Sequence, residues 1–293
     1  MKNNVMARAD LPFFRSLLSR RARPGTGKIK QLDCTPDLHD KQFLFVSGLH
    51  RSGTSILHRH LSEHDDISGF HDTGAPEDEG QHVQNVLPTA RDHGGPGRFT
   101  FDPRAHMRED EALSLERDSR DRLLRQWGAQ WDLGRSVLVE KSPPTLTRAR
   151  FFQELFPNSS FVFLVRHPIA VSFATQRWAR TPLHELMRHW SRAHELMLGD
   201  LAGLRRALVV RYEDYVRSPA STLAAIYDMV GLAAKVPQEE TFDANRRYFD
   251  RWNQCAGEEP EVSRAFEDEN SPARRFGYLA DSPFVERSWG GLI

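Results

Sequence analysis

The chain has 293 residues, 39% of them hydrophobic, which is enough to build a sizeable core in one large domain or two small ones. Forty lysine and arginine residues balance forty aspartate and glutamate residues, so the formal charge is zero. This balance argues against a general electrostatic grip on nucleic acid or on an acidic membrane, and we expect any anion site to be local.

The cysteine content and the apolar runs bear on the compartment. Cys34 and Cys255 are too few for a disulfide framework or a thiolate zinc site, which points to a reducing compartment. No apolar run approaches the roughly 20 residues needed to cross a bilayer, and the amino terminus lacks the apolar core of a signal peptide. We therefore expect a soluble, cytoplasmic protein.

The amino-terminal segment is basic. Residues 1–30 hold eight lysine or arginine residues against one acidic residue, Asp10. A short amphipathic helix is predicted by five apolar residues at helical spacing: Leu11, Phe13, Phe14, Leu17 and Leu18. That helix could touch a membrane surface or dock on its own domain, but chain ends are commonly loose, and we favour self-docking or disorder. We predict a basic tail over residues 1–40 and a single domain over 41–293.

From residue 42 the chain alternates apolar runs with helical stretches. Four short apolar runs predict buried strands at 43–46, 137–139, 161–165 and 208–210. Between the second and third runs, Pro143-Pro144 precedes a helical pattern that begins at Leu146 and stops at Pro157. This alternation predicts an α/β fold in which helices cover both faces of a parallel sheet.

Further helices and loops surround this unit. Ser218 as N-cap, Pro219 at the first helical position and Gly231 at the carboxyl end mark a helix after the fourth run. Longer helices are predicted over 108–131 and 181–203, whereas 94–103, rich in Gly and Pro, and 256–272, rich in acids, are predicted to be surface loops. Residues 237–293 are too mixed for an assignment.

A glycine loop follows the first predicted strand directly. Gly48 and Gly53 stand five apart, as in the G-x-x-x-x-G-K-[ST] loop whose backbone N–H groups and helix N-terminus bind phosphate. The lysine of that loop is absent, because Thr54 occupies its position, and a cation appears instead at Arg51. Without the lysine that neutralises a triphosphate, the loop favours a ligand with a single phosphate at the reacting end.

This loop resembles the 5′-phosphosulfate loop of sulfotransferases, which bind 3′-phosphoadenosine 5′-phosphosulfate (PAPS) and move its sulfuryl group to a hydroxyl or amine. Two further segments are similar to the family's path to its 3′-phosphate site, namely Glu140-Lys141-Ser142-Pro143 and Phe163-Leu164-Val165-Arg166-His167-Pro168. Arg211-Tyr212-Glu213-Asp214-Tyr215 looks like its strand-to-helix junction near the adenine. The resemblance covers roughly residues 42–232 and implies a three-layer P-loop-like fold.

The resemblance implies roles at the donor's 5′ end. Arg51 would oppose the charge that builds on the leaving 5′-phosphate, helped by Lys141, which follows a strand at the edge where parallel strands place ligands. The rest of the loop would supply N–H and hydroxyl donors to the same phosphate: Gly48, His50, Ser52, Gly53, Thr54 and Ser55. For Lys141, a surface ion pair is the alternative.

The 3′-phosphate site is expected around Arg166, at the end of the strongest predicted strand. The family usually has a serine eight residues after this arginine, but here that position is Ala174. Ser172 and Thr175 flank it, and either could donate to the phosphate; we assign Ser172. Tyr212 is assigned to the adenine ring, with aromatic packing at a strand end as the alternative.

The catalytic base is expected within Pro76-Glu77-Asp78-Glu79-Gly80-Gln81-His82, a loop that can fold over the sulfuryl group. Glu79 is the first choice, Glu77 the second and His82 the third, although an ordinary acidic helix start explains the pattern too. No metal is assigned, because His58 and His60 stand two apart on a predicted helix and face different directions.

These assignments predict an enzyme, a PAPS-dependent sulfotransferase that needs no metal, acting on a hydroxyl of a carbohydrate or glycolipid. A P-loop nucleotide kinase, a tyrosyl-protein sulfotransferase and a non-catalytic anion-binding protein remain alternatives. A nucleic-acid partner is not expected, and the oligomeric state is not predicted. Four tryptophans could stack on a sugar or pack in the core: Trp127, Trp131, Trp178 and Trp190.

Overall fold

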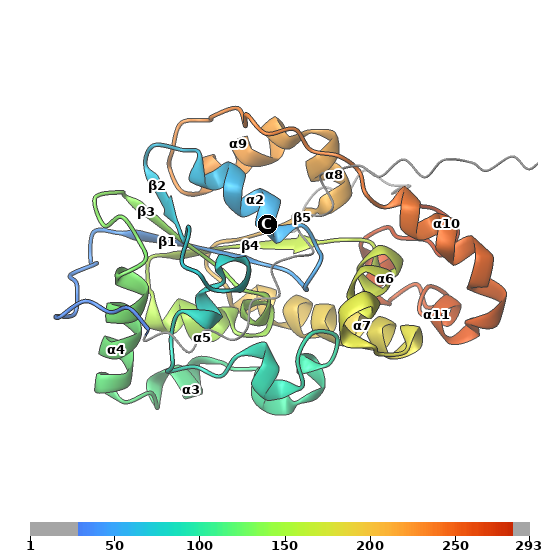
Figure 1. The fold of residues 1–293 in the computed structure, drawn as a ribbon, viewed down its shortest axis with the longest axis horizontal. Coiled ribbons are helices and arrows are strands. Elements are labelled where there is room, and N and C mark those ends of the chain that lie inside the picture. Colours follow the sequence, from blue (N-terminus) through green and yellow to red (C-terminus); the bar gives the residue numbers. More distant parts are fainter. Residues whose placement is uncertain (1–28, 284–293) are drawn as a thin grey trace, which may run out of the picture.

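A five-stranded, wholly parallel sheet forms the middle layer of the computed structural model, which describes residues 29–283 (Figure 1). The strands lie in the order β2-β3-β1-β4-β5. Their bounds are β1 (Gln42–Ser47), β2 (Ile67–Gly69), β3 (Val137–Lys141), β4 (Ser159–Val165) and β5 (Ala207–Arg211). The four strands expected from the sequence are confirmed; the three residues of β2, Ile-Ser-Gly, are too few to show a pattern.

Helices cover both faces of the sheet, as predicted for a three-layer α/β fold (Figure 1). One face packs against α2 (Thr54–Ser62), α8 (Tyr212–Arg217) and α9 (Pro219–Met229). The other packs against α4 (Arg117–Gly128), α5 (Ala149–Leu155), α6 (Pro168–Ala179) and α7 (Leu183–Asp200). The remaining helices are α3 (Glu109–Leu113), α10 (Arg246–Cys255), α11 (Pro260–Arg264) and α12 (Pro272–Arg275).

The apolar runs of the strands are continuous because both faces are buried. In β1, Leu44 and Val46 face the cluster that contains α2 and α9, while Phe43 and Phe45 face the opposite cluster. The Phe45 ring lies 4.9 Å from that of Phe152 on α5, centroid to centroid. Successive side chains of one strand therefore hold the two helical layers on opposite faces of the sheet.

Several predicted elements differ in the structure. The helix expected over 108–131 is broken into α3 and α4, and the Ser114 hydroxyl donates to the Glu111 carbonyl at the break, where it competes with helical hydrogen bonds. The loop expected over 256–272 contains α11, because Val262 and Phe266 are buried and anchor a helical turn. The helix expected from residue 146 begins as a 3-10 turn, Pro143–Thr147, before α5.

Two other helix predictions are settled. Ser218 precedes α9 as expected, but its side chain makes no capping hydrogen bond. The helix expected over 181–203 is confirmed as α7. The amphipathic helix predicted near residues 11–18 lies outside the described residues. Within residues 29–283, no helix is both long and apolar enough to span a membrane.

The stacked phenylalanines of β1 and β4 provide a test of the core. Phe161 is fully buried, 5.3 Å from the Phe45 ring and 6.2 Å from the Phe163 ring. We expect Phe161→Ala to lower the free energy of unfolding by about 3–5 kcal/mol, because it removes a buried ring and leaves a cavity. Leu113→Ala, at a side chain that is 70% exposed, is the control and should change it by less than about 0.5 kcal/mol in denaturant titrations.

Candidate active site

The predicted site residues lie at the carboxyl ends of four strands. Gly48 follows β1, Lys141 ends β3, Arg166 follows β4 and Tyr212 follows β5. Because β1 lies in the centre with β3 on one side and β4 on the other, chain connections diverge at this edge. Such a divergence opens the crevice in which α/β proteins bind ligands. The fold therefore brings together segments up to 164 positions apart, from Gly48 to Tyr212.

The glycines of the loop are required by its geometry. A Cβ on Gly48 would overlap the Leu164 carbonyl oxygen, so β4 can approach only a glycine. Gly53, with φ of 100°, has the left-handed conformation, and a Cβ there would lie 2.7 Å from the Tyr212 ring. Arg51 also has a positive φ, 73°. The loop then enters α2 at Thr54, so the helix N-terminus is directed at the crevice.

A small cavity of about 160 Å³ lies at this loop. Its lining includes His50, Arg51 and Ser55 of the loop region, Glu79 of the predicted base segment, and Arg166. The structure thus brings the predicted phosphate-binding residues and the predicted base to one small space. Ser52 is fully buried, and its Oγ has no hydrogen-bond partner among the described residues.

Lys141 and Glu79 form a buried charged pair beside the loop. Lys141 is 1% exposed; its Nζ donates to the Glu77 carbonyl at 2.5 Å and lies 3.5 Å from Ser55 Oγ and 3.7 Å from Glu79 Oε1. Burial raises the pKa of Glu79 to about 7, against the opposing effect of the Lys141 charge. Glu79 therefore titrates near neutral pH, where a general base is most effective.

The other base candidates occupy different positions. Glu77 accepts a hydrogen bond from Ser55 Oγ at 3.0 Å, and its backbone has a positive φ of 55°. His82 Nε2 lies 3.6 Å from Glu79 Oε2, and burial lowers the pKa of His82. Of the three, Glu79 alone is buried, and its pKa is raised to about 7.

A second buried carboxyl lies next to this pair. Glu140 is 1% exposed and accepts hydrogen bonds from the hydroxyls of Ser142 and Thr145. Burial, with a smaller contribution from the nearby Glu79 charge, raises the pKa of Glu140 to about 7. A Cβ on Gly80 would overlap the Glu140 side chain. The Glu140-Lys141 part of the motif thus packs directly beneath the predicted base segment.

Arg166 is buried and held by contacts from several segments. Its Nη1 donates to the Arg51 carbonyl at 2.9 Å, and its Nε donates to Asn245 Oδ1 at 2.9 Å. The guanidinium carbon lies 4.1 Å from the centroid of the Tyr212 ring. The remaining nitrogen, Nη2, is buried and has no hydrogen-bond partner among the described residues. The arginine is fixed in place, and one of its nitrogens, Nη2, is left for a ligand.

Two of the residues behind Arg166 were missed by sequence reasoning. Asn245 Nδ2 donates to Glu213 Oε1 at 2.6 Å, and Glu213 also accepts from the His167 backbone N–H and from the Tyr278 hydroxyl. Asn245 lies in a segment whose pattern predicts nothing, so no signal marks it. Glu213 lies in the strand-to-helix motif, whose Tyr212 was singled out; its acidic side chain at a strand end was the available signal.

The hydroxyls expected beside Arg166 are directed elsewhere. Ser172 Oγ, on α6, lies 3.9 Å from the sulfur of Met187 on α7. Ser172 and Thr175 both line a cavity of about 10 Å³ with His50 and His189. Which hydroxyl serves a 3′-phosphate stays a prediction. Tyr212 donates its hydroxyl to the Phe242 carbonyl at 2.9 Å and presents its ring to Gly53 and Arg166, so contact with an adenine also stays a prediction.

Several histidines near the site are neutral. Desolvation lowers the pKa of His50 to about 3, and its buried Nδ1 has no partner among the described residues. His60 Nδ1 pairs with the Tyr215 hydroxyl at 2.7 Å, whereas burial lowers the pKa of His58 to about 3. Over residues 29–283 the structure contains no group of three or more His, Cys, Asp or Glu side chains placed to hold a metal ion.

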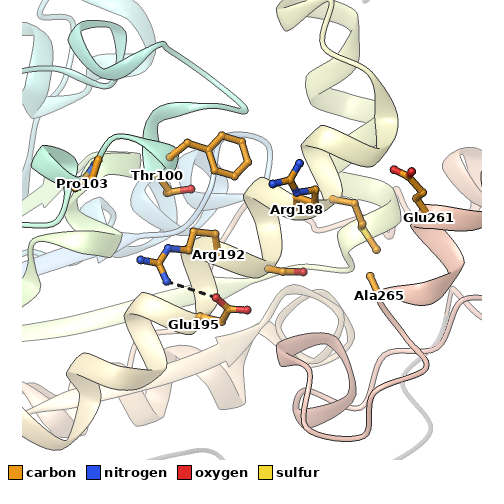
Figure 2. Close-up of a pocket in the computed structure, with 10 residues that line it drawn as sticks. Thr100, Pro103, Arg188, Arg192, Glu195, Glu261 and Ala265 are labelled. Atoms are coloured by element: carbon orange, nitrogen blue, oxygen red, sulfur yellow. Dashed lines mark ion pairs between the residues drawn. The ribbon is translucent and has the colours of Figure 1, made fainter.

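Larger cavities also lie among the described residues. One, of about 610 Å³, meets the site at Ser55, Glu77 and Lys141. Another, of about 390 Å³, lies beside α7 and contains none of the predicted site residues (Figure 2). There, Arg188 lies 5.8 Å from the centre of the Phe101 ring. Figure 2 also shows the ion pair between Arg192 and Glu195, whose N–O distance is 3.7 Å.

Comparison with known proteins yields related sequences and structures. Protein-tyrosine sulfotransferase 2 of Gallus gallus is 26% identical over 203 residues, 65% of this chain and 51% of that protein. The chain thus spans about half the length of this curated relative. The solved sulfotransferase STF1 of Mycobacterium tuberculosis is 20% identical, with a TM-score of 0.46, covering 67% of this chain and 69% of that one. A sulfotransferase domain from the curacin biosynthetic pathway is 19% identical, with a TM-score of 0.43, covering 67% and 75%.

A model of the sulfotransferase family matches residues 44–236, a segment that contains β2, β3, β4 and β5 in full and β1 from Leu44 onward. The matched segment contains the glycine loop, Glu79, Lys141, Arg166 and Tyr212. It accounts for 193 of the 293 residues. The chain therefore belongs to the sulfotransferase family.

Proposed function

We propose that this chain is a PAPS-dependent sulfotransferase that acts on an acceptor hydroxyl. The observation that carries the proposal is the unpartnered Nη2 of the buried Arg166, next to a phosphate loop in which Thr54 replaces the lysine of triphosphate binders. Leaving a buried guanidinium donor unpaired is costly unless a ligand such as a phosphate takes it. The loop amides at the start of α2 and the unpartnered Ser52 hydroxyl fit a second phosphate.

The proposed reaction assigns a task to each group. Glu79 takes the proton from the acceptor hydroxyl while the oxygen of that hydroxyl forms a bond to sulfur. The bond from sulfur to the 5′-phosphate oxygen breaks, and adenosine 3′,5′-bisphosphate leaves. Arg51 and Lys141 stabilise the negative charge that develops on that phosphate, in a buried site where such interactions are strong. Catalysis is mainly positioning and electrostatics.

For the acceptor, we propose a carbohydrate or glycolipid hydroxyl. A tyrosyl side chain of a protein is the second candidate, because the chicken relative is named for that acceptor. Membrane contact by residues 1–30, the cytoplasmic location and the division at residue 40 stay predictions from the sequence.

The donor can be tested by thermal unfolding. Because the loop lacks the triphosphate lysine but retains both glycines, adenosine 3′,5′-bisphosphate should raise the melting temperature in the presence of a chelator. Ligand at 100 times its Kd should stabilise the fold by about 2.7 kcal/mol. A shift that appears only with ATP and magnesium would support a nucleotide kinase instead.

Arg166→Ala tests the 3′-phosphate site. The variant should weaken adenosine 3′,5′-bisphosphate by roughly 10- to 150-fold, because a charge-assisted hydrogen bond of about 1.5–3 kcal/mol is lost. Adenosine 5′-monophosphate, which lacks the contacted group, should bind almost unchanged in calorimetric titrations. Asn245→Ala, which removes the partner of Arg166 Nε, should cause a smaller loss in the same direction. Equal losses for both nucleotides would remove Arg166 from the 3′ site.

Glu79→Gln tests whether Glu79 acts as the general base or only contributes to binding. The amide cannot take a proton, so kcat should fall by roughly 100-fold or more while bisphosphate affinity stays the same. Glu77→Gln, two residues away, is the matched control and should have a much smaller effect. In the unsubstituted protein kcat should rise with pH through about 7, because a base with that pKa is active only when deprotonated. A full rate for Glu79→Gln would place the base elsewhere.

A further inference from the structure

Trp178 differs from the other described tryptophans. Trp127, Trp131, Trp190 and Trp252 are all at least nine-tenths buried, so core packing accounts for them. Trp178 is 51% exposed. Tryptophan offers a large apolar face with little conformational freedom to lose, and an exposed one beside a cavity is suited to contact with a ligand.

The position of Trp178 is fixed by α6, the helix that follows Arg166. Helix α6 begins two residues after Arg166 and ends at Ala179, and its Val171 and Phe173 are buried in the core. Trp178 lies in the last turn of this helix and lines the cavity of about 160 Å³ together with Ser55 and Glu79. The indole is thus mounted on a rigid element at the mouth of the reaction site.

Two neighbours orient the indole. The Arg51 guanidinium carbon lies 5.0 Å from the ring centroid, which is a cation–π contact. The His50 ring meets it edge-on, with centroids 6.5 Å apart, and is neutral because desolvation lowers its pKa to about 3. Both neighbours belong to the phosphate loop, so the aromatic surface and the proposed leaving-group arginine keep a fixed relation.

The size of the cavity limits what it can enclose. Ligand pockets commonly measure about 300–1,000 Å³, and this one measures about 160 Å³. It can hold the reacting ends of the donor and the acceptor but not the whole of either. With the hydroxyl at Glu79, the rest of the acceptor extends out of this cavity, and Trp178, which lines the cavity and is 51% exposed, offers a surface that it can contact.

We propose that Trp178 is the acceptor platform, on which the face of a ring that bears the hydroxyl packs while that hydroxyl reaches Glu79. The inference rests on the proposed sulfuryl transfer and adds the acceptor class: a ring-borne hydroxyl, of a phenol or a pyranose, in preference to an open-chain alcohol. Stacking on an aromatic ring adds affinity beyond the apolar area that it buries.

The test compares three acceptors in the full chain with PAPS as donor: 4-nitrophenol, methyl β-D-glucopyranoside and 1-hexanol. In Trp178→Leu, which keeps apolar bulk but not the flat ring, KM for the preferred ring acceptor should rise roughly tenfold, whereas KM for 1-hexanol should stay within twofold. Trp178→Phe should restore most of the affinity. Whichever ring acceptor shows the larger rise in KM identifies the acceptor class as a phenol or a sugar.

The matched control is Phe101→Leu. Phe101 is also an exposed aromatic, 43% exposed with Arg188 over its ring, but it lines the separate cavity of Figure 2. This variant should leave all three KM values unchanged.

Two results would overturn the inference alone. The first is an equal fall in kcat for all acceptors with unchanged KM in Trp178→Leu, which would mean that the indole acts only through Arg51. The second is equal efficiency with 1-hexanol and both ring acceptors in the unsubstituted protein. Failure of that protein to bind adenosine 3′,5′-bisphosphate in calorimetry is a separate result, since it would overturn the sulfotransferase proposal and this inference with it.

Discussion

The buried guanidinium of Arg166 ties the site together. It donates to the Arg51 carbonyl of the phosphate loop and to Asn245 just before α10, and it lies against the Tyr212 ring at the end of β5. Burying a guanidinium without hydrogen-bond partners is costly, so the partners that these segments supply to Nε and Nη1 favour this one arrangement. One desolvated cation thereby links parts of the chain that come from different strands and from the carboxyl-terminal region.

Local patterns made most of the framework predictable. Apolar runs identified β1, β3, β4 and β5, and the paired glycines with Arg51 placed the loop before α2. Contacts between residues far apart in the sequence could not be predicted from these local patterns. Asn245 acts only because the fold carries it to Arg166, 79 positions away along the chain, and nothing in its own neighbourhood marks it. Likewise, spacing alone could not separate Trp178 from three buried tryptophans, since exposure depends on what packs over each ring.

The site is built largely by removing water. Lys141, Glu79 and Glu140 are each less than one-tenth exposed, although all three can carry charge. Burial weakens the charged form of a carboxyl, and a nearby cation strengthens it; here the first effect dominates for both glutamates. The resulting protonation behaviour comes from packing across several elements, so it cannot be read from the Glu140-Lys141-Ser142-Pro143 motif alone.

The two raised carboxyl pKa values couple folding to acidity. Glu79 and Glu140 have pKa values of about 7 in the folded chain, against 4.5 for the ordinary side chain, so the folded state holds protons that the unfolded state has released. Their contribution to stability is complete below pH 4.5 and is lost as the pH rises through 7. The deprotonation that makes Glu79 an active base therefore lowers the free energy of unfolding. Binding of an anionic sulfuryl donor at the loop would raise the free energy of unfolding again.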